Sequence, residues 1–179
     1  MAISTRRATP ADAPALHDLA ARTFGLATPP GTQQADIDAF IARHLSQSSF
    51  EQYLADPDRI LLVAEEEDGK PVGYAMLVGG PIQDPELAAT VATAGPDSIE
   101  LSKFYVAPDN HGSGVAATLM AETLAAAAAT GATVCWLGVN QRNERAAKFY
   151  AKHGFEIIGT KKFLVGDVWH DDHVRARHI

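Results

Sequence analysis

Residues 99–131 place a strand, a glycine-rich turn and a helix in direct succession, and this unit most restricts how the chain can fold. The segment IELSKFYV (99–106) is rich in apolar, β-branched and aromatic residues, which favour a strand. Pro108-Asp109-Asn110 ends it, and residues 117–129, rich in alanine and leucine, favour a helix that Gly131 is expected to cap. The order of strand and helix signals along the chain predicts an α/β fold, a mixed sheet with helices on both faces.

The rest of the chain supplies the other elements of that order. Strands are expected at residues 2–7, 59–65, 72–78, 133–139, 155–159 and 163–177. Helices are expected from a Thr9 cap to the loop at Pro29, at 36–45, from a Ser48–Glu51 capping box to Pro57, and at 144–153. The long connection 79–98 is expected to hold one helical turn at 85–89 and to contact substrate or another subunit, as in a homodimer.

Length and composition limit the classes of protein to which the chain could belong. A chain of 179 residues fits a single domain, residues 1–179, large enough to bury a core without disulfides. The net charge of −7 argues against nucleic acid as a partner. Because no apolar run reaches the length of a membrane span and the N-terminus lacks an apolar signal core, a cytoplasmic protein without membrane contact is expected.

The glycine-rich turn HGSG (111–114) has the physical properties of an anion-binding site. The first amides of a helix have no partner within it, and the helix dipole makes that end partly positive. Gly112 and Gly114 have no Cβ, so a phosphate or pyrophosphate could approach the backbone closely. The alternative is a turn that only connects strand to helix. The turn matches neither G-x-x-x-x-G-K-[ST] nor G-x-G-x-x-G, so the usual nucleotide fingerprints are absent.

The segment FYVAPDNHGSGVAATLM (104–120) resembles the acyl-CoA-binding segment of the Gcn5-related N-acetyltransferases, the GNAT superfamily. In that family a strand is followed by V-x-P and then by [QR]-x-x-G-x-[GA] at the start of a helix. Val106-Ala107-Pro108 matches the first part, and Gly114 and Ala116 fill the last two positions of the second. His111 stands where the family usually has Gln or Arg, a departure that affects one side chain near the pyrophosphate but not the backbone amides.

A second segment, residues 138–150 followed by Gly154-Phe155, resembles the family pattern N-x-x-N-x-x-A-x-x-F-Y-x-x-x-G-F. The two segments stand in the family's order and spacing and cover roughly the C-terminal half, while the N-terminal half matches more loosely. The resemblance implies a mostly antiparallel sheet of about seven strands, with a V-shaped splay between the fourth and fifth. It also implies direct transfer of an acetyl group from acetyl-CoA to an amine in a ternary complex.

The resemblance further implies where acetyl-CoA binds. The pantetheine arm is expected along residues 104–106 in the splay, with Asn140, Asn143 and Ala146 on its other side. By pattern alone Asn143 is a helix cap, and both roles are compatible. The expected cofactor-binding residues are Phe104, Tyr105, Val106, His111, Gly112, Ser113, Gly114, Val115, Ala116, Asn140, Asn143, Ala146 and Tyr150.

Tyr150 occupies the position of the family's catalytic tyrosine, which makes it the candidate general acid. A phenol could donate its proton to the departing thiolate and recover one from solvent. The alternative is that Tyr150 only packs with Phe149 and Phe155 in the core.

Glu100 is the candidate general base, because it stands on the central strand among apolar neighbours. A carboxylate there would have a raised pKa or act through a water molecule. The alternatives are that Glu100 binds a cationic substrate, or that it pairs with Lys103. A water chain is the other possible base.

The cysteine and histidine residues do not suggest a metal site or a nucleophile. Cys135 lies on a strand that is expected to be buried, where a cysteine is an inert core residue. His170 and His173 would point to opposite faces of a strand and could not share one ion without distortion. No metal is therefore expected.

The segments 136–139 and 163–174 look similar to those of bacterial spermidine/spermine N-acetyltransferases, which implies a polyamine acceptor. Asp171 and Asp172 would then meet the amine, unless they are simply solvated. An amino acid, an antibiotic amine and a protein N-terminus are the other acceptors considered. A non-catalytic acyl-CoA-binding sensor on the same fold is the alternative from another class, and a mononucleotide-binding protein is a more remote one.

Overall fold

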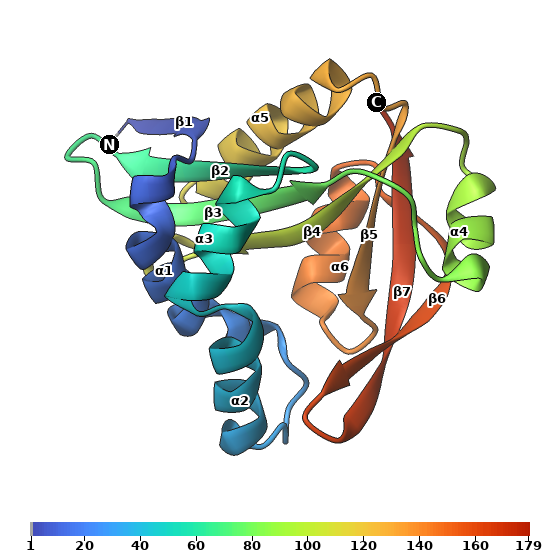
Figure 1. Ribbon diagram of the computed structural model, residues 1–179, viewed down its shortest axis with the longest axis horizontal. Coiled ribbons are helices and arrows are strands. Elements are labelled where there is room, and N and C mark those ends of the chain that lie inside the picture. The colour runs from blue at the N-terminus through green and yellow to red at the C-terminus, as the bar shows by residue number, and fades with distance from the viewer. Residues whose placement is uncertain (1) are drawn as a thin grey trace.

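The computed structural model describes residues 2–179 and contains a seven-stranded mixed sheet with helices on both faces (Figure 1). The strands lie in the order β1-β2-β3-β4-β5-β7-β6, and β4–β5 is the parallel pair among antiparallel neighbours. This is the predicted α/β architecture. The strands are β1 (Ile3–Arg7), β2 (Arg59–Glu66), β3 (Pro71–Val78), β4 (Ser98–Val106), β5 (Val134–Asn140), β6 (Glu156–Val165) and β7 (Val168–His178). The helices are α1 (Ala13–Ala27), α2 (Gln34–His44), α3 (Gln47–Ala55), α4 (Pro85–Ala92), α5 (Val115–Ala129) and α6 (Glu144–Lys152), with short 3₁₀ turns at Pro10–Asp12 and Pro108–Asn110.

The predicted splay lies between β4 and β5. These strands pair only where Ser98–Glu100 lies beside Val134–Trp136. Beyond that point β4 stays with β3 as far as Val106, and β5 stays with β7 as far as Asn140. The sheet therefore opens into a V whose two inner edges have no strand partner.

Two main layers of side chains hold the helices on the sheet. On one face, Leu119 and Met120 of α5 pack against Leu101 and Leu137, and α6 adds partly buried aromatic residues to the same cluster. On the other face, α1, α2 and α3 enclose a cluster built around Phe50 and other buried apolar residues. A smaller cluster joins α4 to the β5–β7 part of the sheet. Burial of this apolar surface, at roughly 25 cal/mol per Å², is the main stabilising contribution to such a fold.

A β-bulge in β4 changes which face its side chains reach. Leu77 pairs with Leu101 and Met76 pairs with Lys103, so Ser102 is the additional residue. In a regular strand, residues three apart point to opposite faces. Here the bulge brings Glu100 and Lys103 to the same face, the one covered by α1–α3.

Several predicted boundaries were wrong at the ends of elements. The cap of α3 is Ser46, whose hydroxyl accepts a hydrogen bond from the Ser49 amide at 3.0 Å, and Ser48 lies inside the helix. The expected turn at 85–89 is the start of α4, which extends to Ala92 and whose first amides donate hydrogen bonds to the Asp84 carboxylate. The predicted strand 163–177 is interrupted at Gly166-Asp167, where β6 turns into β7. Apolar residues continue on both sides of that turn, which concealed it in the sequence.

Candidate active site

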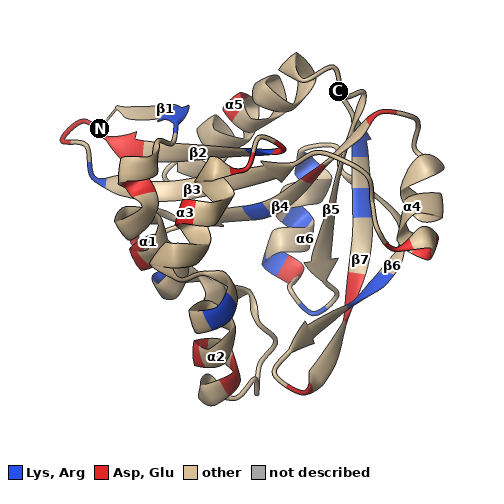
Figure 2. Cartoon of the chain, viewed as in Figure 1, with Lys and Arg blue, Asp and Glu red and all other residues tan. Residues whose placement is uncertain are grey.

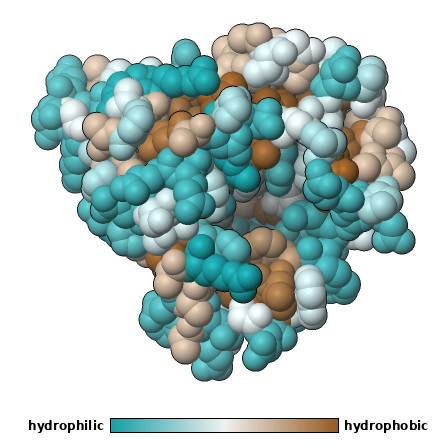
Figure 3. Space-filling model, in the orientation of Figure 1, coloured by the Kyte–Doolittle hydropathy of each residue, from teal (hydrophilic) through white to brown (hydrophobic). Residues whose placement is uncertain are grey.

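A cavity of about 640 Å³ lies at the splay and extends to both sides of β4. It opens as a hollow near the middle of the face in Figure 3. We name its two sides by the elements that form them. The α5–α6 side includes His111, Gly112, Gly114, Asn143, Ala146 and Tyr150. The α1–hairpin side includes Thr23, Phe24, Phe40, Lys161, Phe163 and Asp172, contributed by α1, α2 and the β6–β7 hairpin.

The glycine turn forms the outer end of the α5–α6 side. Gly114 precedes α5 with φ at 87°, a left-handed conformation that suits glycine. No atom lies within 4 Å of the position that a Cβ would take at Gly112 or Gly114, so space is open beside the backbone. The amide of Thr118 is the first to reach back to the Gly114 carbonyl, so the earlier amides have no acceptor within the helix. The turn therefore has open space beside its backbone and helix-start amides without an intrahelical acceptor, the features expected of an anion site.

Three predicted cofactor-binding residues, His111, Ser113 and Val115, differ in whether their side chains reach the cavity. The His111 ring nitrogen Nε2 lies 2.8 Å from the Val106 carbonyl, so the ring is tied to the end of β4 while it lines the cavity. Ser113 is exposed, outside the cavity lining, and its hydroxyl donates to the Asn110 carbonyl. The Val115 side chain is completely buried in the core. Ser113 and Val115 could therefore contribute only backbone groups to ligand binding.

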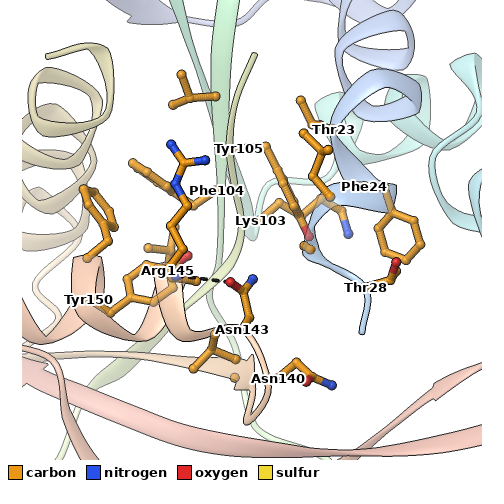
Figure 4. Close-up of a pocket in the computed structure, with 18 of the residues that line it drawn as sticks. Thr23, Phe24, Thr28, Lys103, Phe104, Tyr105, Asn140, Asn143, Arg145 and Tyr150 are labelled. Atoms are coloured by element: carbon orange, nitrogen blue, oxygen red, sulfur yellow. Dashed lines mark hydrogen bonds between the residues drawn. The ribbon is translucent and has the colours of Figure 1, made fainter. Parts of the chain in front are cut away.

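Tyr150 lines the cavity from α6, whose start is fixed by the predicted cap. The Asn143 side-chain oxygen accepts a hydrogen bond from the Ala146 amide at 3.1 Å (Figure 4). The Tyr150 ring packs edge-on against Phe149, Phe155 and Phe104, with ring centres 5.5, 5.8 and 6.4 Å away. Burial raises the pKa of the Tyr150 phenol well above its usual value, so the hydroxyl keeps its proton at neutral pH. Tyr150 thus combines core packing with access to the cavity.

Glu100 and Lys103 line the cavity from the face of β4 that the bulge sets. Burial raises the pKa of the Glu100 carboxyl, an effect that the charges of Lys161 and Lys103 oppose. Burial lowers the pKa of Lys103 to about 8. Within residues 2–179 no ion pair shorter than 4 Å joins the two side chains, so the expected alternative of a direct Glu100–Lys103 pair is wrong. The Lys103 ammonium instead lies 5.7 Å from the centre of the Tyr53 ring.

The β6–β7 hairpin brings charged residues that the sequence did not identify as a group. Asp172 is only 6% exposed, and burial raises the pKa of its carboxyl. Asp171 faces away and pairs with Lys162 on the surface, so of the two aspartates only Asp172 lines the cavity. Lys161 and Phe163 alternate with exposed Lys162 along β6 and also line the cavity. The missed signal was this alternation, which the wrong strand boundary concealed.

Cys135 and the histidines of β7 form no reactive cluster. The Cys135 side chain is completely buried, and burial raises the pKa of its thiol to about 12. His170 lines the cavity, whereas His173 does not. Over residues 2–179, no group of three or more His, Cys, Asp and Glu side chains is arranged to hold a metal ion. The same part of the chain has no helix that combines the length and the apolar character needed to span a membrane.

A mixed sheet split between β4 and β5, with a glycine turn that starts the following helix, is the architecture expected of acyl-CoA-dependent N-acetyltransferases. The family model described as Acetyltransferase (GNAT) family matches residues 15–155, and the chain belongs to this family. It is an acetyl-CoA-dependent N-acetyltransferase.

Comparison with known proteins identifies relatives over almost the whole chain. The uncharacterized N-acetyltransferase Rv2669 of Mycobacterium tuberculosis (strain ATCC 25618 / H37Rv) is 45% identical over 168 residues, which are 94% of this chain and 98% of the relative. The PaiA N-acetyltransferase of Thermoplasma acidophilum, crystallised with coenzyme A, has a TM-score of 0.80 at 19% identity, with 100% of both chains covered. The ribosomal-protein-S18-alanine N-acetyltransferase of Escherichia coli has a TM-score of 0.71 at 17% identity, covering 99% of this chain and 94% of that one. The two structural likenesses concern the fold.

Proposed function

We propose that the enzyme transfers the acetyl group directly from acetyl-CoA to a primary amine, with both substrates bound in the cavity at the splay. The observation that carries this proposal is that one cavity is lined by the glycine turn, by Tyr150 and by Glu100. No enzyme-bound acyl intermediate is needed, since the amine itself attacks the thioester. The buried, protonated Cys135 thiol agrees with a route that uses no cysteine nucleophile.

The α5–α6 side is the proposed place for acetyl-CoA. The free amides at the start of α5 would hold the pyrophosphate, and no side chain crowds the backbone at Gly112 or Gly114. The pantetheine arm would lie along residues 104–106, where the splay leaves the edge of β4 without a strand partner. Asn140, Asn143 and Ala146 line the cavity opposite that edge.

The α1–hairpin side is the proposed place for the acceptor amine. Glu100 would accept a proton from the incoming ammonium, directly or through water. Burial raises the pKa of its carboxyl toward neutral pH, where a general base works best. Tyr150 would donate its phenolic proton to the departing thiolate. The space on this side favours an enzyme over an acyl-CoA sensor, since a sensor needs no room for an acceptor.

Two carboxylates on the α1–hairpin side, Glu100 and Asp172, would attract the ammonium of an acceptor, whether the polyamine that the sequence resemblance implies or another amine. A coenzyme A release assay with spermidine, amino acids and aminoglycosides tests the proposed function. We expect release that depends on both acetyl-CoA and an amine. If calorimetry shows acetyl-CoA binding but no amine causes release, the chain is a sensor and the proposal fails.

A further inference from the structure

Lys161 reaches the cavity across a strand that has no side chain at the crossing point. A Cβ placed on Gly138 of β5 would clash with Cε of Lys161 and lie 3.2 Å from its Nζ. It would also lie 3.3 Å from Oδ2 of Asp172. Real Cβ atoms do not approach a neighbour so closely, so glycine at 138 is what lets the ammonium lie over β5. A side chain at 138 would therefore force the flexible end of Lys161 to shift away from its position over β5.

The neighbouring lysine shows that this orientation is specific to position 161. Lys162 points to the opposite side of β6 and pairs with Asp171, with both side chains more than half exposed. Lys161 has no carboxylate oxygen within 4 Å of its ammonium in residues 2–179, and its nitrogen lies 5.6 Å from the centre of the Phe163 ring. Lys103 reaches the same cavity from β4, and among the described residues it too forms no ion pair. Figure 2 shows basic positions on both β4 and β6.

The cavity thus contains charges of both signs that do not neutralise one another by direct contact. The positive charges of Lys161 and Lys103 act to lower the pKa of Glu100, and that of Lys161 acts to lower the pKa of Asp172. A purely cationic acceptor would meet the positive charges of both lysines in the same cavity, where like charges repel. An acceptor that carries a carboxylate as well as an amine would satisfy both signs.

The wall of the α1–hairpin side is aromatic. Phe24 and Phe40 stack with ring centres 4.4 Å apart, and Phe163 lies 5.6 Å from Phe40. Such a wall favours an apolar or aromatic substituent on the acceptor.

We propose that the acceptor is an amine with a carboxylate close to it and an apolar side chain, an α-amino acid in the simplest form, and that Lys161 binds the carboxylate. The proposal rests on the proposed function and names its substrate class. Lys161 is the specificity-determining residue, with Lys103 as the second positive group, and the two carboxylates face the ammonium end. The acetylated product would be an N-acetyl amino acid.

Matched pairs of amines that differ only in the carboxylate test this proposal. We would measure kcat/KM for L-phenylalanine against phenethylamine and for L-leucine against 3-methylbutylamine, with spermidine alongside. We expect the carboxylate-bearing member of at least one pair to be preferred about tenfold or more over its partner and over spermidine, as expected for a hydrogen bond to a charged group. Lys161→Met should reduce that preference by about tenfold to a hundredfold, mainly through KM. Gly138→Ala should reduce it in the same direction by displacing Lys161.

Lys162→Met is the control, since it removes a lysine one residue away that lies outside the cavity, and it should leave the preference unchanged. The proposal is overturned if the amines without a carboxylate or spermidine are the better acceptors, or if Lys161→Met leaves the preference intact. These outcomes differ from failure of the proposed function, in which acetyl-CoA binds and no amine of any kind is acetylated.

Discussion

At the scale of single residues, Tyr150 and Glu100 illustrate how burial tunes the groups that the proposed reaction needs. Burial raises the pKa of both groups, because it disfavours the charged form of an acid. The same shift has opposite uses. It keeps the phenol protonated, as a proton donor must be, and makes the carboxylate a stronger base than it would be in water.

Tyr150→Phe should lower kcat by about 10²–10⁴-fold, because it removes a proton donor. The affinity for acetyl-CoA should change little, since the ring and its contacts with Phe104, Phe149 and Phe155 remain. Steady-state kinetics and calorimetry on the same preparation separate the two effects. Equal kcat in both proteins would reduce Tyr150 to a packing residue.

Glu100→Gln should change the pH profile of kcat/KM. A general base acts when deprotonated, so wild-type activity should rise as pH increases through the pKa of Glu100, which burial places above the usual 4.5. Deprotonation of the acceptor amine also raises activity, but equally in wild type and variant. The ratio of the two profiles, measured from about pH 5 to about pH 9, therefore isolates Glu100. Parallel profiles would assign the base to water.

At the scale of elements, the turn before α5 and the bulge in β4 matter most. The turn was readable from the sequence because Gly112 and Gly114 stand directly before a run of helix formers. The bulge was not, because Ser102 is a residue that any regular strand accepts and its extra position shows only in the register with β3. The same holds for the β6–β7 turn, where apolar residues on both sides concealed Gly166-Asp167. For these two reasons the sequence did not place Lys103 and Lys161 in the cavity.

Gly114→Leu should weaken acetyl-CoA binding, because a side chain would enter the space beside the amides and the backbone would be strained at φ 87°. Gly131→Leu supplies a matched control at the other end of α5. Gly131 has a similar φ of 91° and open space around it, but it is not among the residues that line the cavity. Both variants should lose stability similarly in urea unfolding, and calorimetry should show weaker binding only for Gly114→Leu. Equal affinity in the two folded variants would contradict the anion site.

At the scale of the whole molecule, the strand and helix order predicted the class of fold, and the family resemblance supplied the splay. Periodicity alone could not place the splay, because the residues of β4 and β5 are as apolar in the split region as in the paired one. The acceptor class that we propose rests on contacts between elements far apart in the sequence, such as Lys161 over Gly138. Such contacts leave no local pattern to read.

Because β4 and β5 pair over only three residues on each strand, the sheet consists of two half-sheets joined by this short parallel ladder. A ligand whose amide groups hydrogen-bond to both open strand edges would hold the two half-sheets together. We expect acetyl-CoA to slow amide hydrogen exchange along residues 101–106 and 137–140 more than in the distant β1–β2 pair. At a concentration about a hundred times Kd it should also stabilise the folded state by about 2.7 kcal/mol, visible as a higher Tm. Protection from hydrogen exchange confined to the α5 turn would mean that the protein core alone holds the two half-sheets together. Acetyl-CoA would then contribute nothing to the stability of the split sheet.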